Sequence, residues 1–365
     1  RDVGVADQRQ HSINEFIDRV ISMTKLAPED PLSKLANETT KIIPDLELFD
    51  TCDLNPDQLK DLALETENSA LEVKGVTNSN GASSSQSKTS FHLSTSNGFS
   101  GGYKKSNFSI SCSAIAGNEL SMQTDYDYDS KVFFKDLKDT SLLGKQAAEN
   151  TVSKCNPKKI KTCKSDVVFD PRVSKTLLSH ISSLVNGSSI ARGSSFLSEK
   201  MNAKIFDREI NIIDNPSILK GLGSKPFDDE GCEMKSFNII ENGILKSWIL
   251  DTTTSQQLGI KSNSRASRGM SSSPSPSPTN MFIENGTISK DEIINNIKDG
   301  FYVTDLIGQG VNLITGDYSR GAGGFKIENG KISFPINEVT IAGNLKDMFH
   351  RMIVPNDLEF KYSLN

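Results

Sequence analysis

Residues 308–348 read G-Q-G-V-N-L-I-T-G-D-Y-S-R-G-A-G-G-F-K-I-E-N-G-K-I-S-F-P-I-N-E-V-T-I-A-G-N-L-K-D-M, and this stretch decides the fold of the chain. Glycine recurs every few residues between short runs of β-branched residues. Glycine allows close approaches between backbones and positive φ angles, whereas β-branched side chains favour strands. The stretch therefore predicts short strands joined by tight turns, in a β-rich C-terminal domain.

The tetrapeptide Ile-Glu-Asn-Gly occurs three times, at residues 240–243, 283–286 and 327–330. Asn-Gly suits the two positive φ angles of a type I′ turn, so the first and third copies predict β-hairpins. The second copy runs into a helix signal and predicts only a turn. The copies are evenly spaced, as in a propeller, but the sequence between them does not repeat. This favours repeated turns over repeated units.

Two helices accompany these strands. One is predicted over 172–186, and one over 290–299, with Ser289 and Glu292 as a capping box and Gly300 as the stop. Between them, residues 271–278 read S-S-S-P-S-P-S-P. Proline lacks the backbone donor that a central strand needs, so this segment predicts a surface loop or an extended wall. It could equally border a peptide groove.

The first half of the chain predicts three further helices. They cover 12–26, with Ser12 and Glu15 as a capping box, then 55–71, with Asn55 as N-cap and Pro56 at the first position, and 140–153. Residues 75–130 are rich in Ser, Gly, Asn and Thr. They predict antiparallel strands, with turns at residues 80–81 and 97–98, both of which read Asn-Gly.

These patterns predict an α+β protein of two domains. Residues 1–153 form an N-terminal α/β domain, residues 154–166 a linker with a local cluster of lysines, and residues 167–365 a β-rich C-terminal domain with a few helices and Asn-Gly hairpins. The chain begins at Arg1 inside what reads as a strand around Val3 and Val5. We therefore expect the N-terminal domain to lack its opening strands.

Composition excludes several classes of protein. The 365 residues carry 41 Lys+Arg against 46 Asp+Glu, a net charge of -5, which argues against direct binding of nucleic acid. The five cysteines are scattered without a C-x-x-C motif, which argues against a disulfide framework and favours a reducing compartment. No stretch approaches the roughly 18 apolar residues of a membrane span. With no signal peptide in the sequence, we expect a cytoplasmic protein without a membrane partner.

Motifs for catalysis are scarce. The four histidines are His11, His92, His180 and His350, and no two have the spacing of metal ligands on one helix. The sequence contains no H-E-x-x-H, no G-x-S-x-G and no Walker motif. The residue types suggest no general base beside Ser319 or Cys232, which are interpreted as a turn residue and a small packed residue.

Two further features leave alternatives open. The acidic group Asp228, Asp229 and Glu230 could hold a cation through oxygen ligands or form an exposed turn. Arg192 could bind a carboxylate through its planar fork of donors or make a structural ion pair. His180 is interpreted as a packed or surface histidine. Motifs alone thus indicate no self-contained catalytic site.

Several segments carry the pattern of a known family. They read S-S-I-A-R-G-S-S-F-L at 188–197, D-N-P at 214–216, G-L-G-S-K-P-F-D-D-E-G at 221–231, S-P-S-P-T-N at 275–280, G-D-Y-S-R-G-A at 316–322 and T-I-A-G-N-L at 340–345. L-A-P-E-D-P at 26–31 and S-N-G-F at 96–99 fit the same pattern. In these segments the chain resembles the TldD/PmbA family, and specifically its PmbA (TldE) branch, also called modulator of DNA gyrase.

The resemblance implies a cytoplasmic metalloprotease of two subunits. Its TldD-type subunit carries an H-E-x-x-x-H helix and a distant cysteine as zinc ligands, and its PmbA-type subunit lacks them and completes the proteolytic chamber. In this sequence His180 matches the first histidine, but Ile181 stands at the glutamate and Val185 at the second histidine. The resemblance therefore implies no catalytic and no metal-binding residue in this chain, and zinc in a TldD-type partner. It also suggests Arg192, Thr279, Asn280 and Arg320 as residues that contact substrate or partner.

Three functions follow as hypotheses. The first is a non-catalytic subunit of a heteromeric zinc peptidase that cleaves unfolded or extended peptides. The second is a homodimeric peptide-binding or scaffold protein without peptidase activity. The third is an autonomous metallohydrolase whose metal site draws on Asp228, Asp229 or His180.

Overall fold

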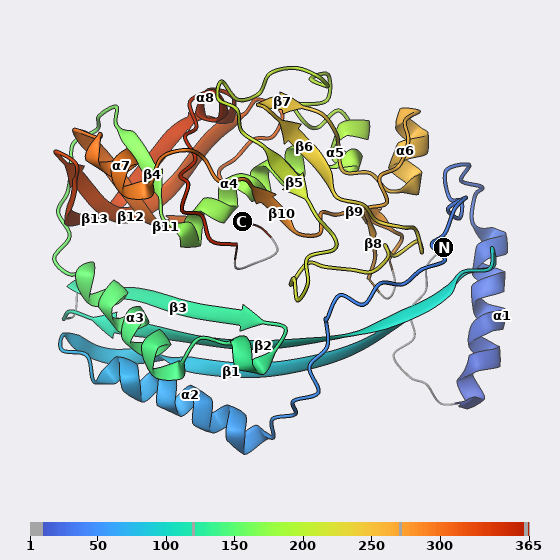
Figure 1. The fold of residues 1–365 in the computed structure, drawn as a ribbon, viewed down its shortest axis with the longest axis horizontal. Helices are drawn as coiled ribbons and strands as arrows, with labels where there is room; N and C mark the ends of the chain where they lie inside the picture. The colour runs from blue at the N-terminus through green and yellow to red at the C-terminus, as the bar shows by residue number, and fades with distance from the viewer. Residues whose placement is uncertain (1–9, 119–120, 270–271, 361–363, 365) are drawn as a thin grey trace.

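The computed structural model describes residues 10–118, 121–269, 272–360 and 364. The fold mixes helices and several sheets, as the sequence predicts. Figure 1 shows two parts, with a long curved sheet and its helices on one side and a more compact body of shorter strands and helices on the other. The predicted strand around Val3 and Val5 lies outside the described residues.

The long sheet contains the antiparallel strands β1 (Val76–Ser94), β2 (Ser100–Ala116) and β3 (Gln123–Lys131), in that order. Helices α2 (Pro56–Leu71) and α3 (Thr140–Ser153) lie along one face of it (Figure 1). The two helices approach closely at Gly144, where an added Cβ would lie 2.1 Å from the carbonyl oxygen of Thr66. Asn55 caps α2 in a capping box with Gln58, so the predicted start of this helix is confirmed.

The two Asn-Gly pairs of this sheet differ in role. The pair at Asn97-Gly98 makes the turn between β1 and β2, as predicted. The turn predicted at Asn80-Gly81 is wrong, because both residues lie inside β1. The register shifts between Ser79 and Gly81, and Gly81 has φ +101°, so the glycine forms a β-bulge in a continuous strand.

Helix α1 (Gln10–Leu26) ends before Pro28, as predicted. It already includes Gln10, so Ser12 lies inside the helix and is not its N-cap, which corrects the predicted start. Ile13, Ile17 and Ile21 recur every four residues on one side, and each stays nearly half exposed. In Figure 1 this helix stands at the outer edge of the molecule.

The second part contains a four-stranded sheet in the order β13-β12-β11-β4. Strand β4 (Asp166–Phe169) runs parallel to β11 (Asp299–Ile307), whereas β12 (Asp317–Glu328) and β13 (Lys331–Asn344) form the antiparallel hairpin that the opening stretch predicts. Asn329 and Gly330 make its turn with φ of 50° and 79°. Helix α4 (Pro171–Leu184) packs against this sheet.

A smaller sheet has the order β10-β5-β6-β7. Its strands are β5 (Ile212–Asp214), β6 (Phe237–Glu241), β7 (Ile244–Leu245) and β10 (Met281–Ile283). Asn242 and Gly243 form the predicted hairpin turn between β6 and β7. The second Ile-Glu-Asn-Gly copy, at residues 283–286, makes no hairpin, and none was predicted there. Gly286 instead donates a backbone hydrogen bond to Pro355, and an added Cβ would lie 1.9 Å from the carbonyl oxygen of Val354.

Short elements complete the chain. They are η2 (Phe134–Asp136), α5 (Gly187–Ala191), α6 (Thr252–Leu258), β8 (Ala266–Ser267), β9 (Ser275–Pro276), α7 (Lys290–Asn295) and α8 (Leu345–His350). Helix α7 ends at Asn295, so the predicted stop at Gly300 is wrong. Gly300 lies in β11, where an added Cβ would meet Ile297 at 2.5 Å, so packing requires the glycine. Within the described ranges, no helix is both long and apolar enough to cross a membrane.

Contacts between the two parts are polar at one end and aromatic at the other. Near the chain connection, Asp125 of β3 pairs with Arg172 of α4 at 2.9 Å and with Lys154 at 2.8 Å. At the far end of the ribbon, the rings of Phe99 and Tyr103 lie edge-on to Phe227, at centroid distances of 5.0 and 5.5 Å. Residues 157–165 connect the parts without a helix or strand.

Along the edge of β13, this connection covers one stretch of backbone. The N–H of Lys158 donates to the carbonyl of Pro335 at 2.9 Å, and the Lys158 ammonium lies 4.4 Å from the centre of the Phe334 ring. Beyond this point, among the described residues, only β12 forms backbone hydrogen bonds with residues 338–343 of β13. The sheet therefore has a short open edge at its outer strand.

Candidate functional site

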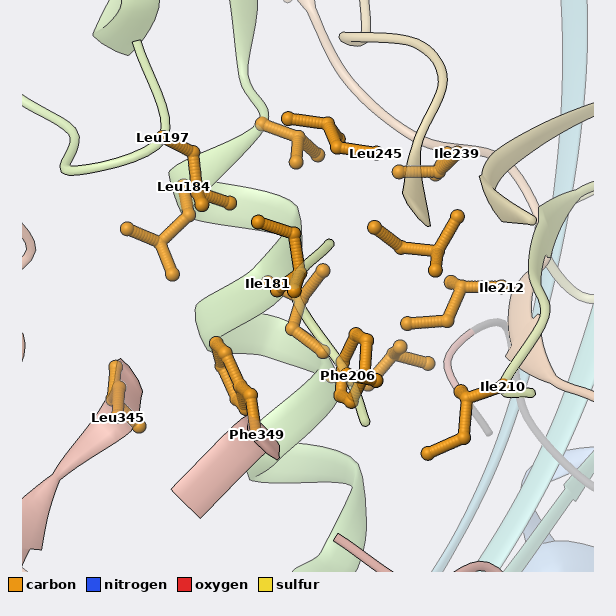
Figure 2. Packing of buried hydrophobic residues seen from close by; sticks show 14 of the residues in the cluster. Ile181, Leu184, Leu197, Phe206, Ile210, Ile212, Ile239, Leu245, Leu345 and Phe349 are labelled. Carbon is orange, nitrogen blue, oxygen red and sulfur yellow. The ribbon is translucent and has the colours of Figure 1, made fainter. Parts of the chain in front are cut away.

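Helix α4 carries the segment that the sequence matches to a metal-ligand helix. Its start is fixed locally, because the side chain of Asp170 accepts the N–H of Arg172 and Pro171 occupies the first turn. The helix positions His180 toward the sheet, next to Ile181. Its direction is set by the core that Figure 2 shows, where α4 residues meet strands and loops from the rest of the domain.

The two positions that a zinc helix needs are both filled by core residues. Ile181 is 1% exposed and Val185 is fully buried, in the same cluster as Leu184 and Phe206 (Figure 2). Neither side chain offers a ligand atom or can activate water. Burying a charged or polar group there would cost several kcal/mol. The residues of this helix therefore do not fit a zinc ion.

Two polar side chains of β12 lie beneath His180. Tyr318 and Arg320 are two residues apart and share one face of the strand, and they are 1% and 8% exposed. The rings of His180 and Tyr318 meet edge to face, with 6.1 Å between centroids. Burial, and then the nearby positive charge of Arg320, lower the pKa of His180. Burial raises the pKa of Tyr318, which Arg320 opposes.

These three side chains share an unusual feature. The Nε2 of His180, the hydroxyl of Tyr318 and the Nε of Arg320 are all buried. The Arg320 guanidinium acts on the Tyr318 hydroxyl, and outside this group no described residue is a hydrogen-bond partner of the three atoms. No described carboxylate forms an ion pair with Arg320 either. Buried polar groups in native proteins are normally satisfied, so each exception calls for an explanation. We call His180, Tyr318 and Arg320 the Arg320 cluster.

The other candidate residues do not join this cluster. Arg192 is the C-cap of α5, with an exposed side chain. Thr279 donates its N–H to Asp214 Oδ1 at 2.7 Å and its hydroxyl to Asp214 Oδ2 at 2.8 Å. Asn280 donates to the Asn215 carbonyl at 2.7 Å and accepts the Gly223 N–H at 2.9 Å. Thr279 and Asn280 thus fasten loops of the domain to one another.

Thr279 belongs to a buried ion pair that sequence reasoning missed. Arg265 and Asp214 are both fully buried and in direct contact through Nε and Oδ2. The remaining donors of Arg265 reach the carbonyls of Asn263 at 2.8 Å and Lys235 at 2.6 Å. Its guanidinium also lies 4.7 Å from the centre of the Phe237 ring. No local sequence pattern links Asp214 to Arg265. The D-N-P motif at Asp214 and the T-N motif at Thr279 were the only signals in the sequence for this network.

Next to Thr279, a pocket of about 180 Å³ opens between the two parts. Two of the side chains that line it are Lys105 of β2 and Lys225. Lys225 pairs with Asp229 at 3.0 Å, whereas Lys105 donates to the Leu222 carbonyl. Burial, and then the charge of Lys225, lower the pKa of Lys105 to about 8.

The acidic segment does not form an exposed turn, which corrects that alternative. Asp228 is fully buried and Asp229 is 5% exposed. Asp228, Glu230 and Cys232 bring their ligand atoms within 4.8 Å of one another. However, Asp228 already accepts the N–H groups of Glu230 and Cys232, and Glu230 accepts the hydroxyl of Thr252 at 2.6 Å. These carboxylates organise loops, and the arrangement leaves no free set of oxygens aimed at a cation.

The same groups show how burial acts on acids. Burial raises the pKa of Asp228 to about 6 and that of Glu230 to about 7. Burial also raises the pKa of the Cys232 thiol, so its thiolate is disfavoured, in agreement with the interpretation as a packed residue. Ser319 lies within strand β12, not in a turn as interpreted from sequence, and its N–H donates to Gly310.

The remaining histidines build no metal site within the described part of the chain. His92 contacts the Ser100 hydroxyl at 3.2 Å, and His350 contacts Asp207 at 3.0 Å. The side chain of His11 lies outside the described residues. The one group of potential ligands found among described side chains is the acidic one above, and it includes no histidine.

These features define an α+β protein in which helix α4 packs over a glycine-rich hairpin. Residues 49–154 match the PmbA/TldA metallopeptidase central domain, and residues 162–365 match the PmbA/TldA metallopeptidase C-terminal domain. The chain belongs to this metallopeptidase family. It is 34% identical over 362 residues to the metalloprotease PmbA of Escherichia coli, covering 98% of this chain and 78% of that relative.

Solved structures agree with this assignment. A crystal structure from Bacteroides thetaiotaomicron, named as a candidate modulator of DNA gyrase, superposes with a TM-score of 0.90 at 28% identity, covering 99% of this chain and 82% of that one. TldE from Thermococcus kodakarensis gives a TM-score of 0.78 at 21% identity, covering 96% of this chain and 80% of that one. The second likeness concerns the fold alone.

Proposed function

We propose that this chain is the non-catalytic PmbA/TldE-type subunit of a heteromeric zinc metalloprotease, and that it completes the proteolytic chamber beside a TldD-type subunit. One observation carries the proposal. Ile181 and Val185 occupy the core at the two positions where a zinc helix needs its base and its second ligand. Zinc chemistry requires ligands and a base to activate water, so hydrolysis in the assembly falls to the partner.

The open edge of β13 supports a role in holding extended peptides. Residues 338–343 are the uncovered part of this outer strand. An extended peptide can add to such an edge by backbone hydrogen bonds, which select for chain conformation more than for sequence. This suits a subunit that binds unfolded or extended substrates.

The cysteines support a cytoplasmic location as part of the same proposal. Cys52, Cys112, Cys155, Cys163 and Cys232 are all free. Free thiols persist in reducing compartments, where disulfides are rare. The natural assembly would then form in the cytoplasm, as a heterodimer with the TldD-type subunit or as a homodimer when this chain is alone.

Zinc content and peptidase activity test the proposal together. The chain is purified alone and after co-expression with a TldD-type protein, and each sample is analysed for metal and assayed on an unfolded protein substrate. We expect about one zinc per heterodimer, activity only in the complex, and no zinc in the lone chain. Failure of the two proteins to form a complex, with no gain in activity on mixing, would contradict it. Stoichiometric zinc in the lone chain would favour an autonomous metallohydrolase. A homodimer without peptidase activity would favour a scaffold protein.

A further inference from the structure

We propose that the Arg320 cluster is an anion site that binds a single carboxylate of an extended peptide. The peptide as the source of the carboxylate rests on the proposed function, whereas the need for an anion rests on the cluster itself. The cluster lies beside the core of the C-terminal domain, between α4 and β12, and includes His180 on the former and Tyr318 on the latter.

The buried charge of Arg320 is the first observation that indicates an anion. A guanidinium stays protonated at any physiological pH. Burying an unpaired charge is costly, and proteins compensate with a counter-ion or a full set of acceptors. Arg320 is 8% exposed, and in the described part of the chain it has neither a carboxylate partner nor an acceptor for its Nε. We infer that a bound group supplies the missing counter-charge.

The neighbours of Arg320 narrow the chemistry of that group. Tyr318 has a buried hydroxyl that can donate, and His180 has a buried Nε2 that donates in one tautomer. Both lie close enough to Arg320 for its charge to act on them. A group that accepts from several donors and offers none matches this set. A carboxylate has two acceptor oxygens and binds a guanidinium through paired hydrogen bonds.

The net charge of the cluster favours a carboxylate over a phosphate. Arg320 supplies one positive charge, and it disfavours a second on His180, whose pKa lies below its usual value. A monoanion would be neutralised by this single charge. A phosphate dianion would bring one uncompensated negative charge into a buried site, which is costly.

The position of Arg320 in the sheet links the cluster to the open edge. Arg320 is paired with Ile341 across β12 and β13, and Ile341 lies within the uncovered residues 338–343. A peptide added along this edge would run one strand beyond Ile341, about 5 Å from β13. A carboxylate on that peptide, either at its C-terminus or on an acidic side chain, would then approach the cluster from the β13 side.

Three peptides of one uncharged, extended-type sequence, each carrying the same uncharged fluorophore, test the site on the purified full chain, without any TldD-type partner. The first has a free C-terminal carboxylate, the second a C-terminal amide, and the third an amide with one internal glutamate. Fluorescence anisotropy gives the affinity of each. We expect at least one acidic peptide to bind about tenfold to hundredfold more tightly than the neutral amide, the range of one charge-assisted pair. The tighter of the two acidic peptides identifies the source of the carboxylate.

Variants of the chain complete the test. Arg320→Met should abolish the preference for acidic peptides, and Arg320→Lys should keep part of it, because lysine retains the charge without the planar fork. Arg208→Met removes an exposed guanidinium and should leave the preference unchanged. Circular dichroism checks that each variant is folded.

Two results would overturn the proposal. One is equal affinity of the wild type for acidic and neutral peptides, which includes the absence of binding by all three up to about 1 mM. The other is an acid preference that persists in Arg320→Met. Because no partner is present, either result leaves the subunit proposal standing, and failure to assemble with a TldD-type protein leaves the anion site standing.

Discussion

Two buried arginines in one domain have opposite surroundings. Arg265 is fully buried against Asp214, with backbone carbonyls and an aromatic ring around the rest of its guanidinium. Arg320 is almost as buried, yet the described chain supplies it with no counter-charge. Arg320 lies in a segment that carries the family pattern, whereas Arg265 lies between two such segments. A sequence motif therefore does not tell whether an arginine is structural or awaits a ligand.

The two arginines differ in whether the surrounding residues satisfy their charge and hydrogen bonds. A polar network that satisfies itself stabilises one conformation and leaves no capacity for binding. A network that is short of an acceptor is unfavourable in the free protein and gains most from a ligand that supplies it. Thr279 therefore has a structural role in the Arg265 network, whereas the Nε of Arg320 has no acceptor among the described residues.

The largest expected effect comes from breaking the complete network. Asp214→Ala leaves Arg265 buried without its carboxylate, and we expect the free energy of unfolding to fall by about 3–5 kcal/mol. Chemical denaturation followed by circular dichroism measures this loss. A loss below about 1 kcal/mol would show that the pair contributes little and that the contrast with Arg320 is unfounded.

A smaller effect should follow from Thr279→Val, which keeps the shape of the side chain and removes one hydrogen bond to Asp214. Bonds to charged groups contribute about 1.5–3 kcal/mol, so stability should fall by that amount. In a double-mutant cycle with Asp214→Ala, the two losses should not add, because both act on one network. Additive losses would separate Thr279 from the ion pair.

The buried carboxyl of Glu230 is a third polar group, and its protonation makes stability depend on pH. Burial raises the pKa of Glu230 from 4.5 to about 7, so the folded state binds its proton more tightly than the unfolded chain. Its contribution to stability is full below about pH 4.5 and is lost as the pH rises through 7. Glu230→Gln should remove this part of the pH dependence of denaturation midpoints. An unchanged pH profile in the variant would contradict the assignment to Glu230.

The smallest effect on stability is expected at Arg320. Arg320→Met removes an unpaired buried charge and keeps much of the side-chain volume, so the free energy of unfolding should change by less than about 1 kcal/mol or rise. The same denaturation experiment measures it beside Asp214→Ala. A loss as large as that of Asp214→Ala would mean that Arg320 has a structural partner after all.

Sequence predicted the elements whose signals are local. The N-cap Asn55, the end of α1 before Pro28 and the hairpin turns at Asn97-Gly98 and Asn329-Gly330 depend on a few neighbouring residues. The failures occurred where a distant partner decides the role of a glycine. Gly81 forms a bulge where β1 pairs with β2. Gly300, in β11, leaves the space that the side chain of Ile297 fills.

In the candidate site, too, local features could be predicted and contacts between distant segments could not. The degenerate zinc helix could be read from Ile181 and Val185 by resemblance, and Arg320 could be named from its motif. That His180, Tyr318 and Arg320 meet could not be predicted, because α4 and β12 come together only through the tertiary fold. The pairing of Arg265 with Asp214 likewise joins segments far apart in the chain.

The connection that lies against Pro335 has a consequence for self-association. A long, bare outer strand is a template on which identical chains stack into aggregates. Here the strand lacks a donor at Pro335, is covered there by Lys158, and has a β-bulge around Glu338, whose φ is 55°. The interdomain connection thus shortens the open edge of β13 on which identical chains could pair.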